Sequence, residues 1–266
     1  MKKYLSFFKI RFIANLQYRA AALAGISTQF AWGTLTIILF KAFYESSPQN
    51  FPMGFYAFVS YIWMQQAFLA FFAMWTFEGD ITDSIVSGSI VYQMSKPIEI
   101  YTLWFTRSAA FRLARGLLRC FPVLIIAAIL PMPYRLVMPD PITFLIFIGS
   151  MILGLCTAAA FTCLIYVLCF FTVSPRGLQI VFLSASEMLM GQVIPIPFFP
   201  ETIRKILELS PFTGIQNIPL RIFSYDISTA DAGKKILLQI FWLIVLFISG
   251  KLIAKAAEKK LVVQGG

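Results

Sequence analysis

Side chains that commonly do chemistry are scarce in this sequence. Histidine, the most frequent general base and metal ligand, is absent. Three carboxylates lie close together at Glu78, Asp80 and Asp83, and a membrane enzyme acting on lipid-linked substrates would have to rely on groups of this kind. Such an enzyme needs a nucleophile, a base and a cation that converge on one point, whereas acidic residues on a surface helix are more often solvated. The sequence therefore predicts no catalytic residue, and this enzyme remains the alternative hypothesis.

The four cysteines give no sign of metal or redox chemistry. Cys120, Cys156, Cys163 and Cys169 all lie within apolar runs, and no two of them have the C-x-x-C spacing typical of metal and redox sites. Buried cysteine usually behaves as a small hydrophobic residue. We therefore predict neither a metal site nor a bound cofactor on this chain.

The sequence contains no phosphate-binding loop of the form G-x-x-x-x-G-K-[ST]. Its two Gly-Lys pairs, at 233–234 and 250–251, lack both the upstream glycine and the following Ser or Thr. Any ATP that drives this protein must be hydrolysed by another polypeptide. We therefore do not expect this chain to be an enzyme.

Composition indicates the class of protein. Of the 266 residues, 59% are hydrophobic and 13% are charged, and the mean hydropathy is +0.80. A soluble domain carries about 25% charged residues, so this much apolar surface requires lipid as its solvent. A transmembrane helix needs about 20 mostly apolar residues, which leaves room for about six. We predict an all-α polytopic membrane protein with six transmembrane helices in a single transmembrane domain, residues 1–266.

The net charge of +10 does not indicate nucleic-acid binding. The basic residues cluster at the edges of hydrophobic runs, where they set membrane topology, rather than on one face. If the N-terminus, residues 78–107, the arginines at 112, 115 and 119, residues 174–177 and the C-terminus share one side, that side holds 15 of the 22 Lys and Arg residues. The positive-inside rule then places both termini and the polar interval 78–98 in the cytoplasm.

Apolar runs predict where the helices lie. Residues 1–19 are basic and aromatic, with Leu5, Phe8, Phe12 and Leu16 along one stripe, which predicts a helix lying in the membrane interface. Six spans are expected at about 20–43, 55–77, 121–130, 142–172, 178–190 and 236–254.

The interval 78–98 is the longest polar stretch before residue 200, and it separates two apolar runs. Its apolar residues fall close to helical spacing, which predicts a short surface helix that breaks near Gly88 and ends at Pro97. It is either a solvated loop between the second and third spans or a docking helix for a cytoplasmic partner. On the docking hypothesis the coupling region is 78–107, and its candidate residues are Asp80, Ile81, Asp83, Ser84, Ile85, Gly88, Ile90, Met94 and Pro97.

A second interrupted stretch, 191–232, is expected outside the membrane between the fifth and sixth spans. Prolines 195, 197 and 200 break the helix, and 201–209 has the pattern of a short amphipathic helix. This pattern predicts a segment that re-enters the membrane in part and is sheltered there by protein. The residues that mark the segment are Gly191, Pro195, Pro200 and Pro211.

Glu187 is the one acidic residue well inside a predicted span. A charged residue at the bilayer centre costs about 2.5–3.5 kcal/mol on insertion scales, so it is expected to face protein. One hypothesis pairs Glu187 with Arg119, which counting along the helices places at a similar depth. The alternative is that Glu187 is protonated or is hydrogen-bonded to Ser184 or Ser186.

Four arginines precede the third expected span, at 107, 112, 115 and 119, and the last three share a helix face. Arg112, Arg115 and Arg119 follow one another at spacings that place them near one face of a helix. They either form a solvated start to the span or line a polar surface inside a bundle. The solvated position is favoured for Arg112 and less strongly for Arg119.

Two stretches carry a resemblance to a known family. IVSGSIVYQMSKPI at 85–98 is similar to the cytoplasmic pattern of ABC-2-type permeases, the membrane subunits of ABC exporters, and GQVIPIPFFPETIRKILELSPF at 191–212 resembles their exterior segment. The matching positions are Gly88, Met94, Lys96 and Pro97 in the first stretch and Gly191, Pro195, Pro200, Pro211 and Phe212 in the second.

The resemblance implies a multi-pass subunit of a bacterial ATP-driven exporter in the cytoplasmic membrane. This chain would pair with a second permease subunit, either a different homologous chain or another copy, among membrane lipids. Two cytoplasmic ABC ATPase subunits, which bind ATP and magnesium, would clamp beneath 78–98. The exported substrate would be lipid-like, amphipathic or drug-like. A standalone carrier is the third hypothesis, although the sequence has no internal repeat of the kind such carriers show.

Overall fold

The computed structural model describes residues 2–17, 19–95 and 97–260, without the side chains of 19–24 and 260. Helices make up 78% of the structure, and the described residues form no strand. Two of the helices, Pro141–Phe171 and Thr229–Lys259, are long and apolar enough by length and composition to cross a membrane. The all-α prediction is confirmed for this part of the chain, and two such helices are consistent with a membrane location.

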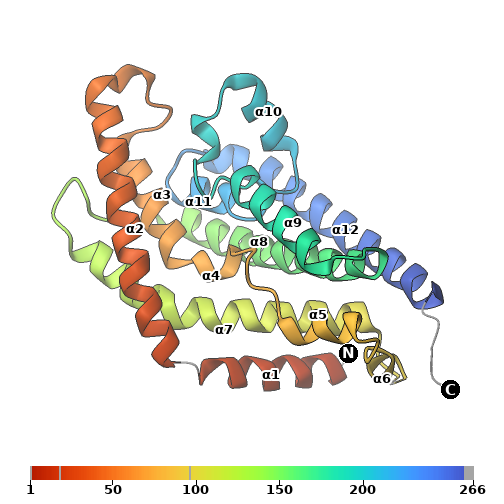
Figure 1. Ribbon diagram of the computed structural model, residues 1–266. Helices are drawn as coiled ribbons and strands as arrows, with labels where there is room; N and C mark the ends of the chain where they lie inside the picture. Colours follow the sequence, from red (N-terminus) through yellow and green to blue (C-terminus); the bar gives the residue numbers. More distant parts are fainter. Residues whose placement is uncertain (1, 18, 96, 261–266) are drawn as a thin grey trace.

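Figure 1 shows the α-helices of the described residues in chain order. They are α1 (Lys2–Leu16), α2 (Arg19–Ser46), α3 (Phe55–Ala67), α4 (Leu69–Phe72), α5 (Gly79–Val86), α6 (Val91–Met94), α7 (Ile100–Ile129), α8 (Pro141–Leu168), α9 (Pro175–Leu189), α10 (Glu201–Leu209), α11 (Asn217–Phe223) and α12 (Thr229–Lys260). Three 3₁₀ turns lie between them, at Pro48–Asn50, Cys169–Phe171 and Ile196–Phe198. The apolar runs of the sequence fall on α2, on α3 with α4, and on α7, α8, α9 and α12.

α7 is longer than the sequence indicates. The predicted span at 121–130 occupies only its final part, because one helix runs from Ile100 to Ile129 and contains the arginines that precede the apolar residues. Arginine is a good helix former, so a change in polarity does not end a helix. The hydropathy pattern marks the point at which α7 becomes apolar, and the helix itself begins more than five turns earlier.

α8 lies at the centre of the fold. Of its most apolar 18 residues, 72% are buried, against 17% for the equally apolar window of α12. α7 and α12 both pack against α8 (Figure 1), and its small residues permit close approach. A Cβ added to Gly154, for example, would lie 2.2 Å from the carbonyl oxygen of Ile215. α8 therefore serves as the surface on which the rest of the chain is assembled.

α1 lies beside α7 (Figure 1). Phe8 and Phe12 are half-buried, and the Tyr4 hydroxyl accepts a 3.2 Å hydrogen bond from the backbone N–H of Glu99. Leu5, one turn before Phe8 on the same stripe, is 72% exposed. Exposed apolar side chains beside lysines are the pattern expected of a helix in a membrane interface.

The chain between α9 and α12 is broken at the residues that the sequence marks. Gly191 has a φ of +81° directly after α9, Pro195 leads into a 3₁₀ turn, Pro200 precedes α10, and Pro211 lies in the turn before α11. The side-chain amide of Gln65 donates to the Gly191 carbonyl at 3.1 Å. This bond holds the left-handed turn, which favours glycine, against α3.

α11 is a short buried helix within this broken segment. Asn217 at its start is fully buried, and its side-chain amide donates to the Thr213 hydroxyl at 3.1 Å. The helix packs on α8 and α3. Gln239 of α12 donates to the Gly214 carbonyl at 2.7 Å. Polar backbone sheltered by protein in this way is what a re-entrant segment requires.

We predict that acid weakens the start of α8 through Asp140. Its carboxylate accepts hydrogen bonds from the Thr143 hydroxyl at 2.7 Å, from the Tyr225 hydroxyl at 2.8 Å and from the backbone N–H of Ile142 at 3.0 Å. These bonds, the Thr143 hydroxyl first, lower the pKa of Asp140 to about 2. Because an unfolded aspartate titrates near about 3.9, the stabilisation is fully present above that pH and is lost as the pH falls through about 2.

Thermal melting between pH 6 and pH 2 measures this effect. Asp140→Ala should melt below the wild type at pH 6, and the difference should close as the pH approaches 2. A difference that stays constant over this range would show that the carboxylate charge is not involved.

Candidate functional site

Residues 78–95, 97 and 98, here called the elbow, form a small two-helix unit, and Lys96 lies outside the described residues. α5 begins directly after Glu78, and Asp80 in its first turn complements the positive end of the helix dipole. Gly88 has a φ of +73°, and an added Cβ there would meet nothing within 4 Å. This left-handed residue lets the chain turn between α5 and α6, at the position where the sequence predicts a break.

The apolar face of the elbow is turned toward the chain's own core. Ile81 and Ile90 are 1% and 0% exposed, and they belong to a buried cluster that includes Trp104 and Tyr166. Ser84 is also buried. These three positions were expected to face a partner, and the structure corrects that prediction. An amphipathic helix lays its apolar side on the nearest apolar surface, which here is provided by α7 and α8.

The outer face of the elbow has a different set of residues. Asp83, Gly88 and Pro97 are exposed, as are Val86 at 66% and Tyr92 at 78%. Both are large apolar side chains exposed on an otherwise polar turn, where a partner protein can cover them. Neither was singled out by the sequence, because their spacing falls outside the apolar stripe.

Arg107 of α7 holds the start of the elbow. Its guanidinium donates to Glu78 at 2.6 Å and to both carboxylate oxygens of Asp80 at 2.6 and 2.8 Å. The backbone N–H of Glu78 donates to the Tyr166 hydroxyl of α8 at 2.6 Å. Burial raises the pKa of Glu78, although the charge of Arg107 opposes this shift. The first turn of the elbow is therefore fixed to two long helices.

Further bonds join the elbow and its flanks to two more helices. Gln179 of α9 donates to the Thr82 hydroxyl at 2.8 Å. At the start of α7, Glu99 pairs with Lys251 of α12 at 3.0 Å. Burial raises the pKa of Glu99, but its hydrogen bonds with Lys251 and Thr102 outweigh burial and lower the pKa overall. The elbow and the residue that follows it are therefore bonded to α7, α8, α9 and α12.

Arg112 is completely buried, so the solvated position favoured by the sequence is wrong. Its guanidinium donates to the carbonyls of Phe71 and Ala73 at 3.1 and 2.7 Å and to the Thr162 hydroxyl at 2.7 Å. The two carbonyls lie at the end of α4, where helical carbonyls have no partner within the helix. Arg112 therefore satisfies, from the buried side of α7, the carbonyls that have no helical partner where α4 ends.

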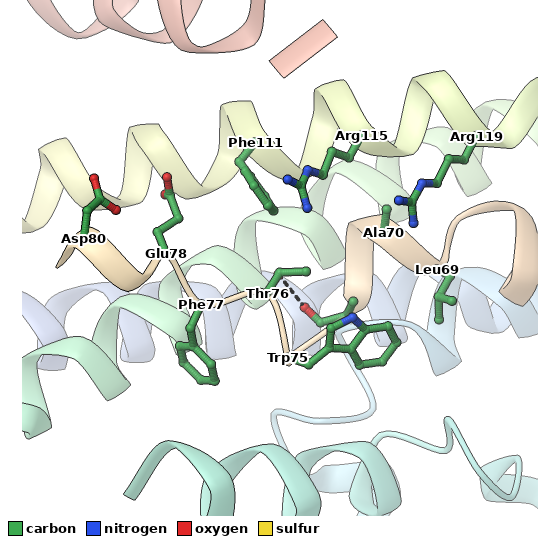
Figure 2. A pocket seen from close by; sticks show the side chains of 11 residues that line it. Leu69, Ala70, Trp75, Thr76, Phe77, Glu78, Asp80, Phe111, Arg115 and Arg119 are labelled. Carbon is green, nitrogen blue, oxygen red and sulfur yellow. Dashed lines mark hydrogen bonds between the residues drawn. The ribbon is translucent and has the colours of Figure 1, made fainter. Parts of the chain in front are cut away.

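A cavity of about 400 Å³ lies beside this closure, between α7 and the chain that joins α4 to α5 (Figure 2). Arg115 and Arg119 extend into it from α7, and Glu78 and Asp80 lie toward its other end. The Arg115 guanidinium lies over the ring of Phe111, with 4.0 Å between Cζ and the ring centroid. The arginines thus line a polar surface inside the fold.

The structure does not bring Arg119 and Glu187 together. A Cβ added to Gly25 would lie 2.9 Å from the Arg119 guanidinium carbon, so Arg119 lies against α2. Glu187 is half-buried on α9 and takes part in none of the ion pairs formed by the described residues. Ser186 donates to the Phe182 carbonyl at 2.5 Å. The pairing hypothesis compared only the depth of the two residues in the membrane. Two residues at the same depth can lie on helix faces that do not contact each other.

Metal chemistry has no support in the part of the chain that the structure describes. No group of three or more His, Cys, Asp or Glu side chains there is arranged to hold a metal ion. All four cysteines are free, and Cys120, Cys163 and Cys169 are buried.

Comparisons with known proteins return no matching family model, no matching curated protein and no matching solved structure.

Proposed function

We propose that this chain is the transmembrane permease subunit of a bacterial ATP-driven exporter of the ABC-2 type. The elbow is the observation that carries the proposal, because it is a polar element held by several long helices that leaves a partly apolar outer face exposed. The partners are two ATPase subunits, which bind ATP and magnesium, and a second permease subunit, either a homologous chain or another copy. The substrate class is a lipid-like, amphipathic or drug-like molecule moved outward.

On this proposal six helical units cross the cytoplasmic membrane. They are α2, α3 with α4, α7, α8, α9 and α12, with both termini and the elbow in the cytoplasm and α10 outside. α9 has 15 residues and so spans about 22 Å, less than the roughly 30 Å of a hydrocarbon core. The broken chain after α9 supplies the remaining length, and its burial against α3 and α8 supports this arrangement.

The bonds of the elbow support a coupling role. Arg107, Tyr166 and Gln179 attach it to three different helices. Closing of the ATPases against the outer face would therefore tilt these helices together instead of bending a loose connection. A concerted tilt of this kind opens a path outward or sideways into lipid.

The enzyme hypothesis is weaker than the transporter hypothesis. Its candidate carboxylates, Glu78 and Asp80, both accept hydrogen bonds from Arg107, and Asp83 is exposed on the outer face. These contacts give the two inner carboxylates a structural role. Both line the cavity of about 400 Å³, but each is paired with Arg107, whereas acid–base catalysis requires a carboxyl group that exchanges a proton with the substrate.

Charges placed on the outer face of the elbow should separate the permease from its ATPase. Val86→Asp combined with Tyr92→Asp changes two exposed residues and leaves the buried isoleucines in place. The complex purified from native membranes should hydrolyse ATP. The double variant should retain less than a tenth of the ATP hydrolysis per mole of permease, because desolvating two new carboxylates opposes docking.

A matched pair on α10 provides the control. Ile206→Asp with Leu209→Asp alters residues that are 67% and 68% exposed and lie on the side assigned to the exterior. This variant should keep the full ATPase activity. Undiminished activity of the elbow variant, or ATP hydrolysis by the isolated permease, would contradict the proposal.

A further inference from the structure

A second cavity, of about 560 Å³, lies between the second half of α7 and the first half of α8. Met64, Phe71 and Phe223 extend into its inner wall from α3, α4 and α11. None of its 18 lining residues, all within the described part of the chain, carries a charge. The thiol of Cys120, also in the lining, donates to the Leu117 carbonyl at 3.6 Å. A ligand in this cavity therefore meets apolar side chains throughout.

The inner wall of this cavity is closely packed. The ring centroids of Phe147 and Phe223 lie 5.0 Å apart, and those of Phe68 and Phe71 lie 5.2 Å apart. A Cβ added to Gly116 would lie 1.9 Å from the Phe71 ring, so this ring rests directly on the backbone of α7. Rings packed in this way have little freedom to move into the space beside them. The cavity is therefore present before any ligand arrives.

The outer side of the cavity is open. Phe121, Ile125 and Ile152 in the lining are 60%, 58% and 58% exposed, and Ala128 is exposed as well. From Phe121 to Ala128 the opening extends about 10 Å along α7. This is less than one leaflet, which is half of a hydrocarbon core of roughly 30 Å. On the proposed topology the second half of α7 lies in the outer leaflet, so the opening faces the acyl chains there.

We infer that this cavity binds one acyl chain of a membrane phospholipid. A methylene group occupies roughly 30 Å³, as a water molecule does, so the 560 Å³ cavity holds a single chain of about 18 carbons. An empty apolar cavity forfeits the van der Waals contacts of its lining, and an acyl chain restores them. The inference rests on the membrane location in the proposed function, but it does not depend on export or on an ATPase.

A second copy of the chain fits this opening less well than an acyl chain does. A stable protein interface uses about 20–30 residues on each side. A partner helix, about 10 Å wide with its side chains, would cover the opening without filling the space behind it. Six of the lining residues are exposed, namely Phe121, Ile125, Ala128, Met138, Ile148 and Ile152.

Photolabelling of the purified full chain in phosphatidylcholine nanodiscs tests the inference. The probe is a phosphatidylcholine with a diazirine in one acyl chain, added as a small fraction of the lipid, and mass spectrometry locates the label. We expect residues 113–128 and 144–152 to carry at least five times as much label per exposed residue as residues 237–252 of α12, whose exposed apolar side chains lie outside this cavity. Equal labelling of the two regions would show contact with bulk lipid only and would overturn the inference.

Ala128→Trp places an indole ring in the opening and should reduce the labelling of residues 113–128 and 144–152 at least threefold. Ala185→Trp makes the same change at an exposed position of α9 outside the cavity, and it should alter this labelling less than twofold. Equal labelling of the two variants would contradict the inference. A wild-type chain that forms a dimer and carries no label in these two regions would assign the opening to a second copy, which also overturns it.

Discussion

Replacing Arg112 with leucine is expected to lower the free energy of unfolding by about 2–4 kcal/mol. The substitution leaves the Phe71 carbonyl in the interior without its hydrogen bond of 3.1 Å and removes a 2.7 Å bond to the Ala73 carbonyl. Thr162 loses less, because its hydroxyl also donates to the Ala158 carbonyl at 2.9 Å. Relief of the buried charge offsets part of the cost, which is why the expected loss is smaller than the sum of the separate bonds.

Thermal melting in detergent measures this loss, which corresponds to a fall in Tm of roughly 10 °C for a chain of this size. Arg112→Lys should not restore the stability, because an ammonium group keeps the buried charge but lacks the planar fork that reaches three acceptors. Arg135→Leu is the control, since Arg135 is exposed in the turn before α8, and it should change stability by less than about 0.5 kcal/mol. An Arg112→Leu variant as stable as the wild type would show that the arginine serves a purpose other than stability.

Gly154→Ala should be comparably disruptive, with a loss of about 3 kcal/mol. The new Cβ would lie 2.2 Å from the Ile215 carbonyl oxygen and 3.2 Å from the Gly214 carbonyl oxygen. Both are backbone atoms, and the Gly214 carbonyl is held by Gln239 of α12 at 2.7 Å. The chain before α11 would therefore have to move away from α8, and the polar contacts that shelter it would be strained.

Gly149 on the same helix provides a matched control for this prediction. A Cβ added there meets nothing within 4 Å, so Gly149→Ala should leave the packing unchanged. Alanine favours the helix over glycine by up to about 1 kcal/mol, so this variant should melt at or above the wild-type temperature. Equal melting temperatures for the two alanine variants would show that the close contact at Gly154 is not needed for stability.

Local structure in this chain could be predicted from sequence because local residues determine it. Gly88 and Gly191 interrupt helices with positive φ, as turn chemistry requires. Prolines mark the broken segment after α9 for the same reason. The long apolar runs predicted the positions of α2, α8 and α12, since lipid and a protein core both demand continuous apolar residues, but they missed the start of α7.

Tertiary placement could not be predicted in this way. The spacing of Ile81 and Ile90 predicts one apolar face, but it does not show whether that face meets a partner or the chain's own core, and the core is what it meets. Arg112 and Arg119 lie on one helix, and only Arg112 is fully buried. The carbonyls that accept its hydrogen bonds belong to a segment about 40 residues earlier. A pattern of residues within a short sequence window cannot identify acceptors that lie so far away in the chain.

The acceptors of Arg112 also set an order of events during synthesis. Two of them, the carbonyls of Phe71 and Ala73, precede it in the chain, whereas Thr162 follows it by 50 residues. At roughly 5–20 residues per second, several seconds separate the translation of Arg112 from that of its last acceptor. On the proposed topology, α7 reaches the membrane as a helix whose guanidinium is only partly satisfied, and α8 completes it. On this topology, the hydrogen bonds of Arg112 are complete only after α8 has been translated and has packed against α7.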